Sequence, residues 1–230
     1  ITDKKAFLQL IFSTYDVKEQ RQIDNFGLFS HIERSLRGVC KDVVINIFKK
    51  LERKNAMQKR LIKPTLEWEK PIQVFREEMV DTQSILAGVG SLRENADVEA
   101  WLQRISQFEN PATVPEGLVR SLQSIYVDIS QQKVIGMIQL RCELNDYLKH
   151  FGGHIGYSIA PSERRKGNGK AMLQACLTKA KEEGLSEVLI TCDPSNEGSR
   201  GVILGCGGRY QETVYHPEEA RYYEHYLLEC

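Results

Sequence analysis

The spacing of hydrophobic residues changes once along the chain, near residue 60. Before that point apolar side chains recur at intervals of three and four, as at Phe7, Leu10 and Ile11, a period typical of amphipathic helices. Breaks at residues 15–16 and at Gly38 divide this part into three predicted helices. We therefore expect a small all-helical extension over residues 1–59.

From Arg60 the pattern changes to short apolar runs separated by helical segments and turns. Two of the runs, residues 124–129 and 133–144, are joined by a short polar turn and predict a hairpin. The other predicted elements are strands over residues 61–66, 154–159, 187–191, 209–214 and 221–228, helices over residues 67–81, 97–108 and 196–204, and a helix that closes at Gly184. This order predicts an α/β domain with a mixed sheet over residues 60–230.

A basic, glycine-containing loop connects the strand at residues 154–159 to the helix that closes at Gly184. Arg164, Gly167 and Gly169 form the pattern Arg-x-x-Gly-x-Gly where the strand leads into the helix N-terminus. Glycines let the backbone turn without a Cβ penalty, so that successive N–H groups and the positive end of the helix dipole point at one place. The loop therefore predicts an anion site that would suit a pyrophosphate.

Two familiar phosphate-binding motifs do not fit this loop. A P-loop needs glycine where Arg164 stands and a serine or threonine where Ala171 stands. A dinucleotide-binding fingerprint needs glycine where Met172 stands. The plain alternative is a solvated turn, because glycines among basic residues often form one.

The residues flanking the loop resemble a known signature. Ile159, Pro161, Arg164, Gly167, Gly169 and Ala171, followed by Asn196-x-x-Ser199 and by Gly207-Gly208, resemble the acetyl-CoA signature of the GNAT superfamily of N-acetyltransferases. The segments GGHIGYS, SER-x-KG and ITCD-x-x-N-x-x-S are more closely similar to a bacterial subgroup of acetyltransferases. The resemblance runs from about residue 60 to the C-terminus, and it implies the GNAT acetyltransferase fold with acetyl-CoA as co-substrate.

The resemblance also implies which residues hold acetyl-CoA. The main chain of Tyr157, Ser158 and Ile159 would bind the pantetheine arm and the acetyl carbonyl, which needs hydrogen-bond donors as it gains charge. The basic side chain of Arg164 and the loop from Arg165 to Lys170 would bind the pyrophosphate, and the loop consists of Arg165, Lys166, Gly167, Asn168, Gly169 and Lys170. Asn196 would contact the pantetheine arm, with Ser199 one turn further along the helix. Asn196 is equally suited to a helix N-cap.

Acetyl transfer to an amine also requires proton transfer. A lysine-like amine with a pKa of about 10.4 is protonated at neutral pH and must lose a proton before it attacks. Glu143 and His154 are the candidate bases, each with a structural or surface role as its alternative. Many members of the superfamily carry a tyrosine acid at the position of Ile203, and Tyr210 and Tyr215 are the nearby tyrosines.

Charge is balanced overall but not along the chain. Lysine plus arginine and aspartate plus glutamate number 31 each, whereas residues 1–60 carry a balance of +6 and the remainder −6. A basic helical unit could bind nucleic acid, but we favour packing on the acetyltransferase domain or on a second subunit, because its apolar face is broad and its basic cluster lacks aromatics. The −6 balance mildly favours a cationic acceptor.

Other sequence features bear on metal binding, membrane association and cellular location. The six cysteines have no metal-ligand spacing, so we expect no metal and free thiols in a reducing compartment. No apolar run approaches the roughly 20 residues of a membrane span and no signal peptide is visible, so we expect no membrane association and a cytoplasmic enzyme. We expect a small-molecule or peptide amine as acceptor, and a homodimer is left open.

Two other functions are left open by the sequence. One is a catalytically silent CoA-binding regulatory protein. The other is an acetyltransferase with a nucleic-acid-binding N-terminal module.

Overall fold

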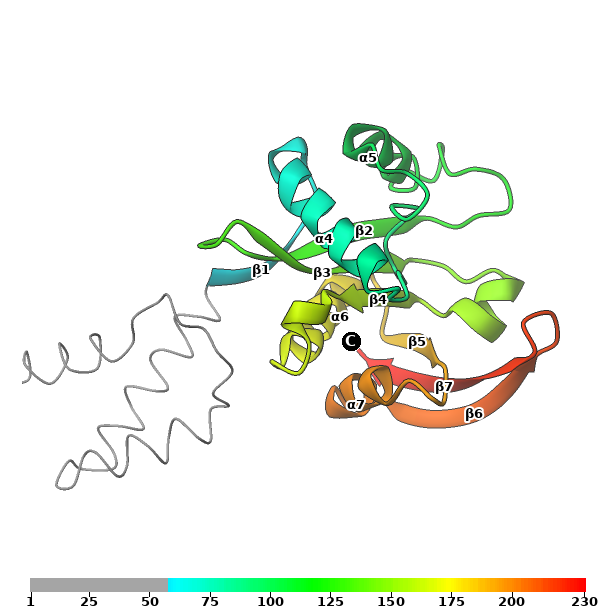
Figure 1. The fold of residues 1–230 in the computed structure, drawn as a ribbon. Helices are drawn as coiled ribbons and strands as arrows, with labels where there is room; N and C mark the ends of the chain where they lie inside the picture. The colour runs from blue at the N-terminus through cyan, green and yellow to red at the C-terminus, as the bar shows by residue number, and fades with distance from the viewer. Residues whose placement is uncertain (1–57) are drawn as a thin grey trace, which may run out of the picture. The chain divides into compact units, whose positions relative to one another are not determined.

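The computed structural model describes residues 58–230, which form two antiparallel sheets and the helices that pack on them (Figure 1). The three helices expected over residues 4–57 lie outside these described residues, so the N-terminal extension and its boundary at residue 59 stay predictions. Within residues 58–230, no helix combines the length and the apolar character that crossing a membrane requires.

The first sheet has the strand order β1-β2-β3-β4, and each neighbouring pair is antiparallel. Its strands are β1 (Lys59–Ile62), β2 (Ser121–Asp128), β3 (Lys133–Arg141) and β4 (Ile155–Ile159). β2 and β3 form the hairpin that the sequence predicts. Ile125 and Val127 of β2 pack into one hydrophobic core and Tyr126 into another, because successive side chains of a strand point to opposite faces. Both faces of this sheet are therefore covered.

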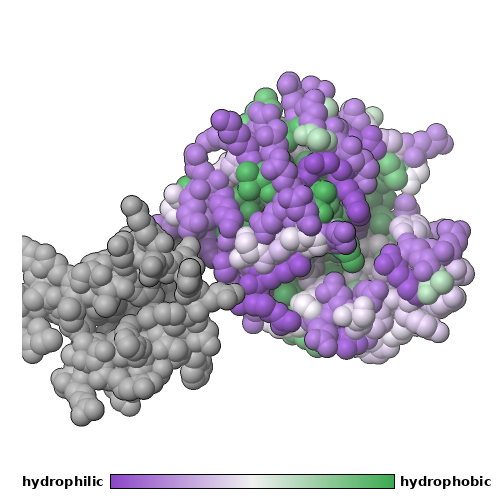
Figure 2. All heavy atoms as spheres, viewed as in Figure 1, coloured by the Kyte–Doolittle hydropathy of each residue, from purple (hydrophilic) through white to green (hydrophobic). Residues whose placement is uncertain are grey.

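Helices cover the two faces of the first sheet. α4 (Glu69–Asp81) and α5 (Val98–Ser106) pack on one face, and α6 (Asn168–Glu182) packs on the other (Figure 1). Ile72, Phe75 and Met79 of α4 are spaced by three and four residues and are fully or almost fully buried, together with Trp101 of α5. The face of the molecule seen in Figure 2 is mostly hydrophilic, with apolar side chains in scattered areas. The helices thus turn their apolar stripes inward, as their periodicity predicts.

The second sheet has the strand order β5-β7-β6, again with antiparallel neighbours. Its strands are β5 (Glu187–Cys192), β6 (Arg209–His216) and β7 (Arg221–Glu229), and α7 (Glu197–Gly205) connects β5 to β6. Val188 and Ile190 of β5 and Leu228 of β7 pack against the same core as α6. The mixed α/β fold is therefore confirmed for the described residues. The mixed sheet that the sequence predicts is instead two antiparallel sheets, because no ladder of backbone hydrogen bonds joins β4 to β5 within residues 58–230.

Several element boundaries differ from the predictions, for example at the start of β2, which is Ser121 rather than residue 124. β1 ends at Ile62 rather than at Leu66, because Pro64 has no N–H group to donate to a sheet, and Leu66 begins the short 3₁₀ helix η1 (Leu66–Trp68). β3 ends at Arg141, and a π-helical turn that the sequence did not predict, η2 (Leu148–Gly152), precedes β4. A second 3₁₀ turn, η3 (Pro161–Glu163), precedes the glycine loop.

Candidate functional site

The two sheets meet at one point and then separate. The N–H group of His154 donates to the carbonyl of Leu189 at 2.7 Å, and the N–H group of Leu189 donates to Nδ1 of His154 at 2.8 Å. Past this point no backbone hydrogen bond joins β4 to β5 in residues 58–230. The edge of β4 that faces β5 is therefore unpaired over most of its length.

The backbone groups on this unpaired edge belong to alternate residues of β4. The carbonyl of His154 accepts from Arg141 of β3 at 2.7 Å, and the N–H group of Ala160 donates to Ile135 of β3 at 2.9 Å. Residues of an antiparallel edge strand alternate between pairing with the neighbour and facing away from it, so Tyr157 and Ile159 face away from β3. Tyr157 thus presents backbone donors and acceptors to the space between the sheets.

Ser158 faces the other way. By the same alternation its backbone pairs with β3, opposite Met137. Its hydroxyl donates to the carbonyl of Ala87 at 2.7 Å, in the segment that follows α4. Of the three β4 residues expected to contact acetyl-CoA, Ser158 is the one whose backbone is directed at β3.

The glycine loop ends at an uncapped helix N-terminus. Gly167 is the N-cap of α6 and has φ of +77°, in the left-handed region that favours glycine. No side chain caps α6, so the N–H groups of Asn168, Gly169 and Lys170 in its first turn are left for an external acceptor. These N–H groups and the helix dipole are suited to the anion that the loop sequence predicts.

Two of the basic side chains in the loop are engaged by the protein. The guanidinium of Arg164 donates through Nε to the carbonyl of Ile159 at 3.0 Å and through Nη2 to the hydroxyl of Ser84 at 3.0 Å. Lys166 pairs with Glu163 at 3.3 Å. Arg164 therefore links the loop to the end of β4 and to the segment that follows α4 by hydrogen bonds.

The other polar side chains of the loop divide between the interior and the solvent. Asn168 is buried, donates through Nδ2 to the carbonyl of Glu163 at 2.9 Å and accepts from Lys59 at 2.9 Å. Arg165 and Lys170 are exposed. These two residues leave a positive charge beside the N–H groups of α6.

A pair of hydroxyl groups joins β4 to α7. Asn196 caps α7 by accepting from the N–H group of Ser199 at 3.0 Å, and the Ser199 hydroxyl lies 2.9 Å from the hydroxyl of Tyr157. Burial raises the pKa of Tyr157 above its usual value, and the hydrogen bond to Ser199 offsets only part of that shift. The phenol is therefore protonated at neutral pH and can donate a hydrogen bond. The sequence predicted a main-chain role for Tyr157, and its side-chain contact was missed.

The two candidate bases lie in different settings. Burial lowers the pKa of His154, and the positive charge of Arg141 lowers it further. The Nδ1 atom of His154 accepts a backbone N–H, so the neutral ring carries its proton on Nε2 and its lone pair is already engaged. Glu143 is exposed beyond the end of β3 and makes no hydrogen bond or ion pair with residues 58–230. The structure does not bring these two side chains together by any contact.

Tyr210 and Tyr215, the tyrosines near the position where many superfamily members carry a tyrosine acid, make their contacts within the second sheet. Ile203 is fully buried in the core beneath α7. The hydroxyl of Tyr210 bonds to Thr213 at 2.8 Å, and the ring of Tyr215 packs on Tyr222, so both tyrosines make their contacts within the β6–β7 hairpin.

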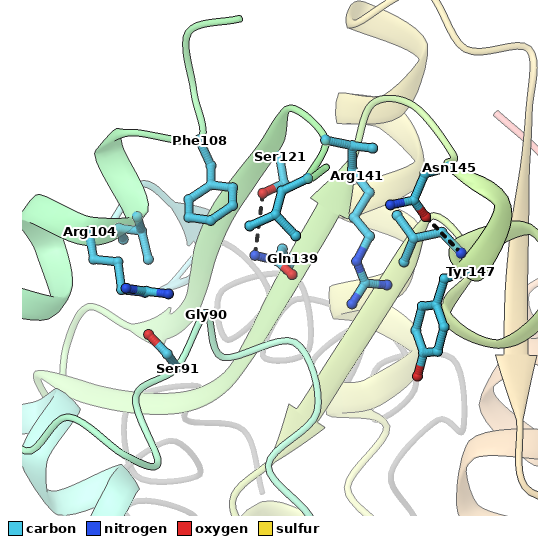
Figure 3. Close-up of a pocket in the computed structure, with 13 residues that line it drawn as sticks. Gly90, Ser91, Arg104, Phe108, Ser121, Gln139, Arg141, Asn145 and Tyr147 are labelled. Atoms are coloured by element: carbon cyan, nitrogen blue, oxygen red, sulfur yellow. Dashed lines mark hydrogen bonds between the residues drawn. The ribbon is translucent and has the colours of Figure 1, made fainter. Parts of the chain in front are cut away.

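A pocket of about 330 Å³ lies between α5, the segments on either side of α5, and the end of β3 (Figure 3). We call it the α5 pocket. Its polar lining consists of Ser91, Arg104, Ser121, Gln139, Arg141, Asn145 and Tyr147. None of these residues was predicted from the sequence, because they come from separate segments of the chain and share no motif. Arginine and serine in a shared hollow are suited to binding a ligand with hydrogen-bond acceptors.

Comparisons with known proteins identify the fold. The family model described as "Acetyltransferase (GNAT) domain" matches residues 65–209. Among solved structures, the ribosomal-protein-S5-alanine acetyltransferase from Vibrio fischeri is 16% identical with a TM-score of 0.58, covering 75% of this chain and 93% of that chain. RimJ from Mycobacterium smegmatis, in complex with CoA-disulfide, is 16% identical with a TM-score of 0.53, covering 75% and 82%.

A further solved structure is that of the microcin C7 self-immunity acetyltransferase MccE in complex with acetyl-CoA and AMP. It is 14% identical with a TM-score of 0.54, covering 75% of this chain and 93% of that chain. No protein of curated function matches the chain. The family match spans more than half of the sequence. The chain therefore belongs to the GNAT acetyltransferase family and is an N-acetyltransferase.

Proposed function

We propose that the protein transfers an acetyl group from acetyl-CoA directly to the nitrogen of an amine. The observation that carries this proposal is the unpaired edge of β4, which leads through the loop to the uncapped N-terminus of α6. An extended thioester with a pyrophosphate at one end matches a row of backbone groups that ends at an anion site. MccE, a solved structure with the same fold, is in complex with acetyl-CoA.

Each part of acetyl-CoA has a matching part of the site. The pyrophosphate would bind the N–H groups of α6, with Arg165 and Lys170 adding positive charge. The pantetheine arm would lie along β4 beside Asn196 and Ser199 on α7. The edge-facing N–H groups of β4, foremost that of Tyr157, would stabilise the thioester oxygen as it gains charge.

The transfer step balances in protons. The ammonium form of the acceptor first loses a proton, and the neutral nitrogen then attacks the thioester carbon. The tetrahedral intermediate loses a second proton from nitrogen as the carbon–sulfur bond breaks. One proton ends on the CoA sulfur and the other passes to solvent.

The proton-transfer groups follow from the same geometry. A thiol has an ordinary pKa of about 8.5, whereas the pKa of Tyr157 is raised, so a proton moves unfavourably from this phenol to the thiolate. Tyr157 would therefore stabilise the leaving sulfur by a hydrogen bond rather than by protonating it. The assignment of the base to Glu143 or His154 stays a prediction. His154 can act as a base only after its bond to Leu189 opens.

The experiment is a transfer assay on the full chain. Acetyl-CoA is supplied with a panel of amines, and CoA release is followed with a thiol reagent while mass spectrometry identifies acetylated products. We expect amine-dependent CoA release with acetylation at nitrogen. Binding of acetyl-CoA without turnover over the whole panel would instead support the catalytically silent alternative.

The nucleic-acid alternative has its own test. Salt-dependent binding to duplex DNA that disappears when residues 1–58 are removed would support a nucleic-acid-binding extension.

A further inference from the structure

The α5 pocket carries positive charge without a carboxylate. Its charged lining residues are Arg104 and Arg141, and no aspartate or glutamate lines it. In the view of Figure 3, Arg104 from α5 and Arg141 from the end of β3 stand on either side of Gln139. Two guanidinium groups around one hollow favour an anionic ligand.

Arg141 is held in place but not neutralised. Its Nη1 atom donates to the carbonyl of Gly152 at 2.8 Å and to that of Gly153 at 3.0 Å. Its Nε and Nη2 atoms make no hydrogen bond with residues 58–230, and no carboxylate there pairs with it. Burial lowers the pKa of Arg141, yet a guanidinium stays protonated in proteins. A partly buried cation with unused donors is stabilised by an anion that enters the pocket.

One other polar group of the pocket is also unsatisfied, and a second is free to move. The Oγ atom of Ser91 is buried and has no hydrogen-bond partner among the described residues. Arg104 makes no ion pair with residues 58–230 and is exposed, so its guanidinium can move to meet a ligand. Buried polar atoms are normally hydrogen-bonded, and an orphaned hydroxyl that lines the same pocket as unused guanidinium donors indicates a ligand with acceptor oxygens.

The pocket adjoins the strand that would bind the thioester. A Cβ atom added to Gly156 of β4 would lie 3.5 Å from Nη2 of Arg141, so this guanidinium lies close to the backbone of β4. Gly156 directly precedes Tyr157, whose backbone faces the gap between the sheets. A molecule with its anionic end at Arg141 could thus present another group close to the middle of β4.

We propose that the α5 pocket binds a carboxylate of the acceptor, so that the acceptor is an amine carrying a carboxylate, such as an amino acid. This inference rests on the proposed acetyl transfer and names its substrate class. It opposes the preference for cations that the −6 balance of the domain suggests. Salt screens the attraction between a ligand and the net charge of the domain beyond about 8 to 10 Å. Direct contacts between a carboxylate and two arginines are screened much less.

The test compares amines that differ in one charge. The full chain, loaded with CoA, is titrated by calorimetry with L-amino acids and with their α-amides, and the same pairs serve as acceptors with acetyl-CoA. For the preferred pair we expect the acid to bind at least about tenfold more tightly than the amide, because hydrogen bonds to charged groups are the stronger ones. β-Alanine against 2-aminoethylphosphonate distinguishes a carboxylate site from a phosphate site, and a preference for the phosphonate contradicts the carboxylate assignment.

The variants are Arg104→Gln, Arg141→Lys and the control Arg60→Gln, which removes an exposed charge on β1 outside the pocket. We expect Arg104→Gln to reduce the acid-to-amide ratio severalfold and Arg60→Gln to leave it unchanged. If Arg141→Lys fails to fold, the acid-to-amide ratio of Arg104→Gln still tests the inference.

Four outcomes overturn the inference: no acid binds, acid and amide bind equally, the phosphonate is preferred over β-alanine, or Arg104→Gln leaves the acid-to-amide ratio unchanged. Acetyl-CoA binding is measured separately on the same samples. A failure of the acetyltransferase proposal therefore leaves the comparison of acid and amide intact.

Discussion

The hydroxyl of Tyr157 on β4 lies 2.9 Å from the hydroxyl of Ser199 on α7, although the two residues are 42 positions apart in the chain. Ser199 in turn gives its N–H group to the capping side chain of Asn196. One chain of hydrogen bonds thus links the middle of β4 to the start of α7. We infer that this link fixes the distance between the two elements that would enclose the pantetheine arm.

The link can be tested through stability. We expect Tyr157→Phe and Ser199→Ala each to lower the free energy of unfolding, with a coupling of about 1 kcal/mol between them, because removing either hydroxyl already breaks the bond. Urea unfolding of the wild type, both single variants and the double variant gives this coupling. Losses that simply add would show that the two hydroxyl groups do not interact in solution.

The kinetic role of the same phenol is a separate prediction. Because its pKa is raised, we expect Tyr157→Phe to lower kcat by less than about tenfold, whereas loss of a true proton donor typically costs a hundredfold or more. Steady-state kinetics with saturating acetyl-CoA measures the effect. A loss of a hundredfold or more would mean that Tyr157 protonates the leaving sulfur after all.

His154 makes stability depend on pH. Its folded-state pKa is lowered, so below its unfolded value of about 6.5 the unfolded chain binds a proton that the folded chain does not. The wild type should therefore lose stability as pH falls through about 6.5 towards the lowered pKa. His154→Asn keeps an acceptor for Leu189 but cannot titrate, so its free energy of unfolding should fall less steeply there. Equal slopes for both proteins in denaturant titrations from about pH 7 to about pH 5 would contradict this account.

Gly88 packs directly on the backbone of β4. A Cβ atom there would lie 1.8 Å from the carbonyl oxygen of Gly156, and φ is +67°. Gly117 has φ of +78° but nothing within 4 Å of an added Cβ atom. Gly117→Ala should therefore carry only the cost of a left-handed alanine, about 1 to 2 kcal/mol, and Gly88→Ala a clearly larger loss or failure to fold. Similar thermal unfolding of the two variants would show that the loop does not approach β4 this closely.

Local patterns predicted the elements that depend on local residues. The spacing of Ile72, Phe75 and Met79 located α4. The predicted loop ran to Gly169, whereas α6 already begins at Asn168. The turn η2 was missed because residues Leu148–Gly152 are too few to show the spacing of apolar residues that predicts a helix. The turn lies in the connection between β3 and β4.

The missed functional groups depend on contacts between distant segments. Whether Ser158 or Tyr157 faces the gap depends on the pairing of β4 with β3, which periodicity does not reveal. The hydrogen bond that Nδ1 of His154 accepts from Leu189 depends on where β5 contacts β4. Arg104 and Arg141 line the same pocket only because the fold brings α5 and β3 together. No sequence signal would have drawn attention to these arginines, because each lies within a predicted element and its lack of an ionic partner is visible only in the structure.

Calorimetric titration of acetyl-CoA tests the central claim most directly, with Gly169→Asp and a control, Gln174→Glu. Both variants add one negative charge to α6, the first beside its N-terminal N–H groups and the second on an exposed position further along. Arg165→Glu with Lys170→Glu provides a second loop variant that leaves the packing of Gly169 on Val202 unchanged.

We predict that the wild type and Gln174→Glu bind acetyl-CoA, that Gly169→Asp does not, and that the charge-reversed loop binds more weakly. Folding of each protein is checked beforehand by circular dichroism. A wild type that fails to bind, or a Gly169→Asp variant that binds as well as the wild type, would contradict the assignment of this loop to acetyl-CoA.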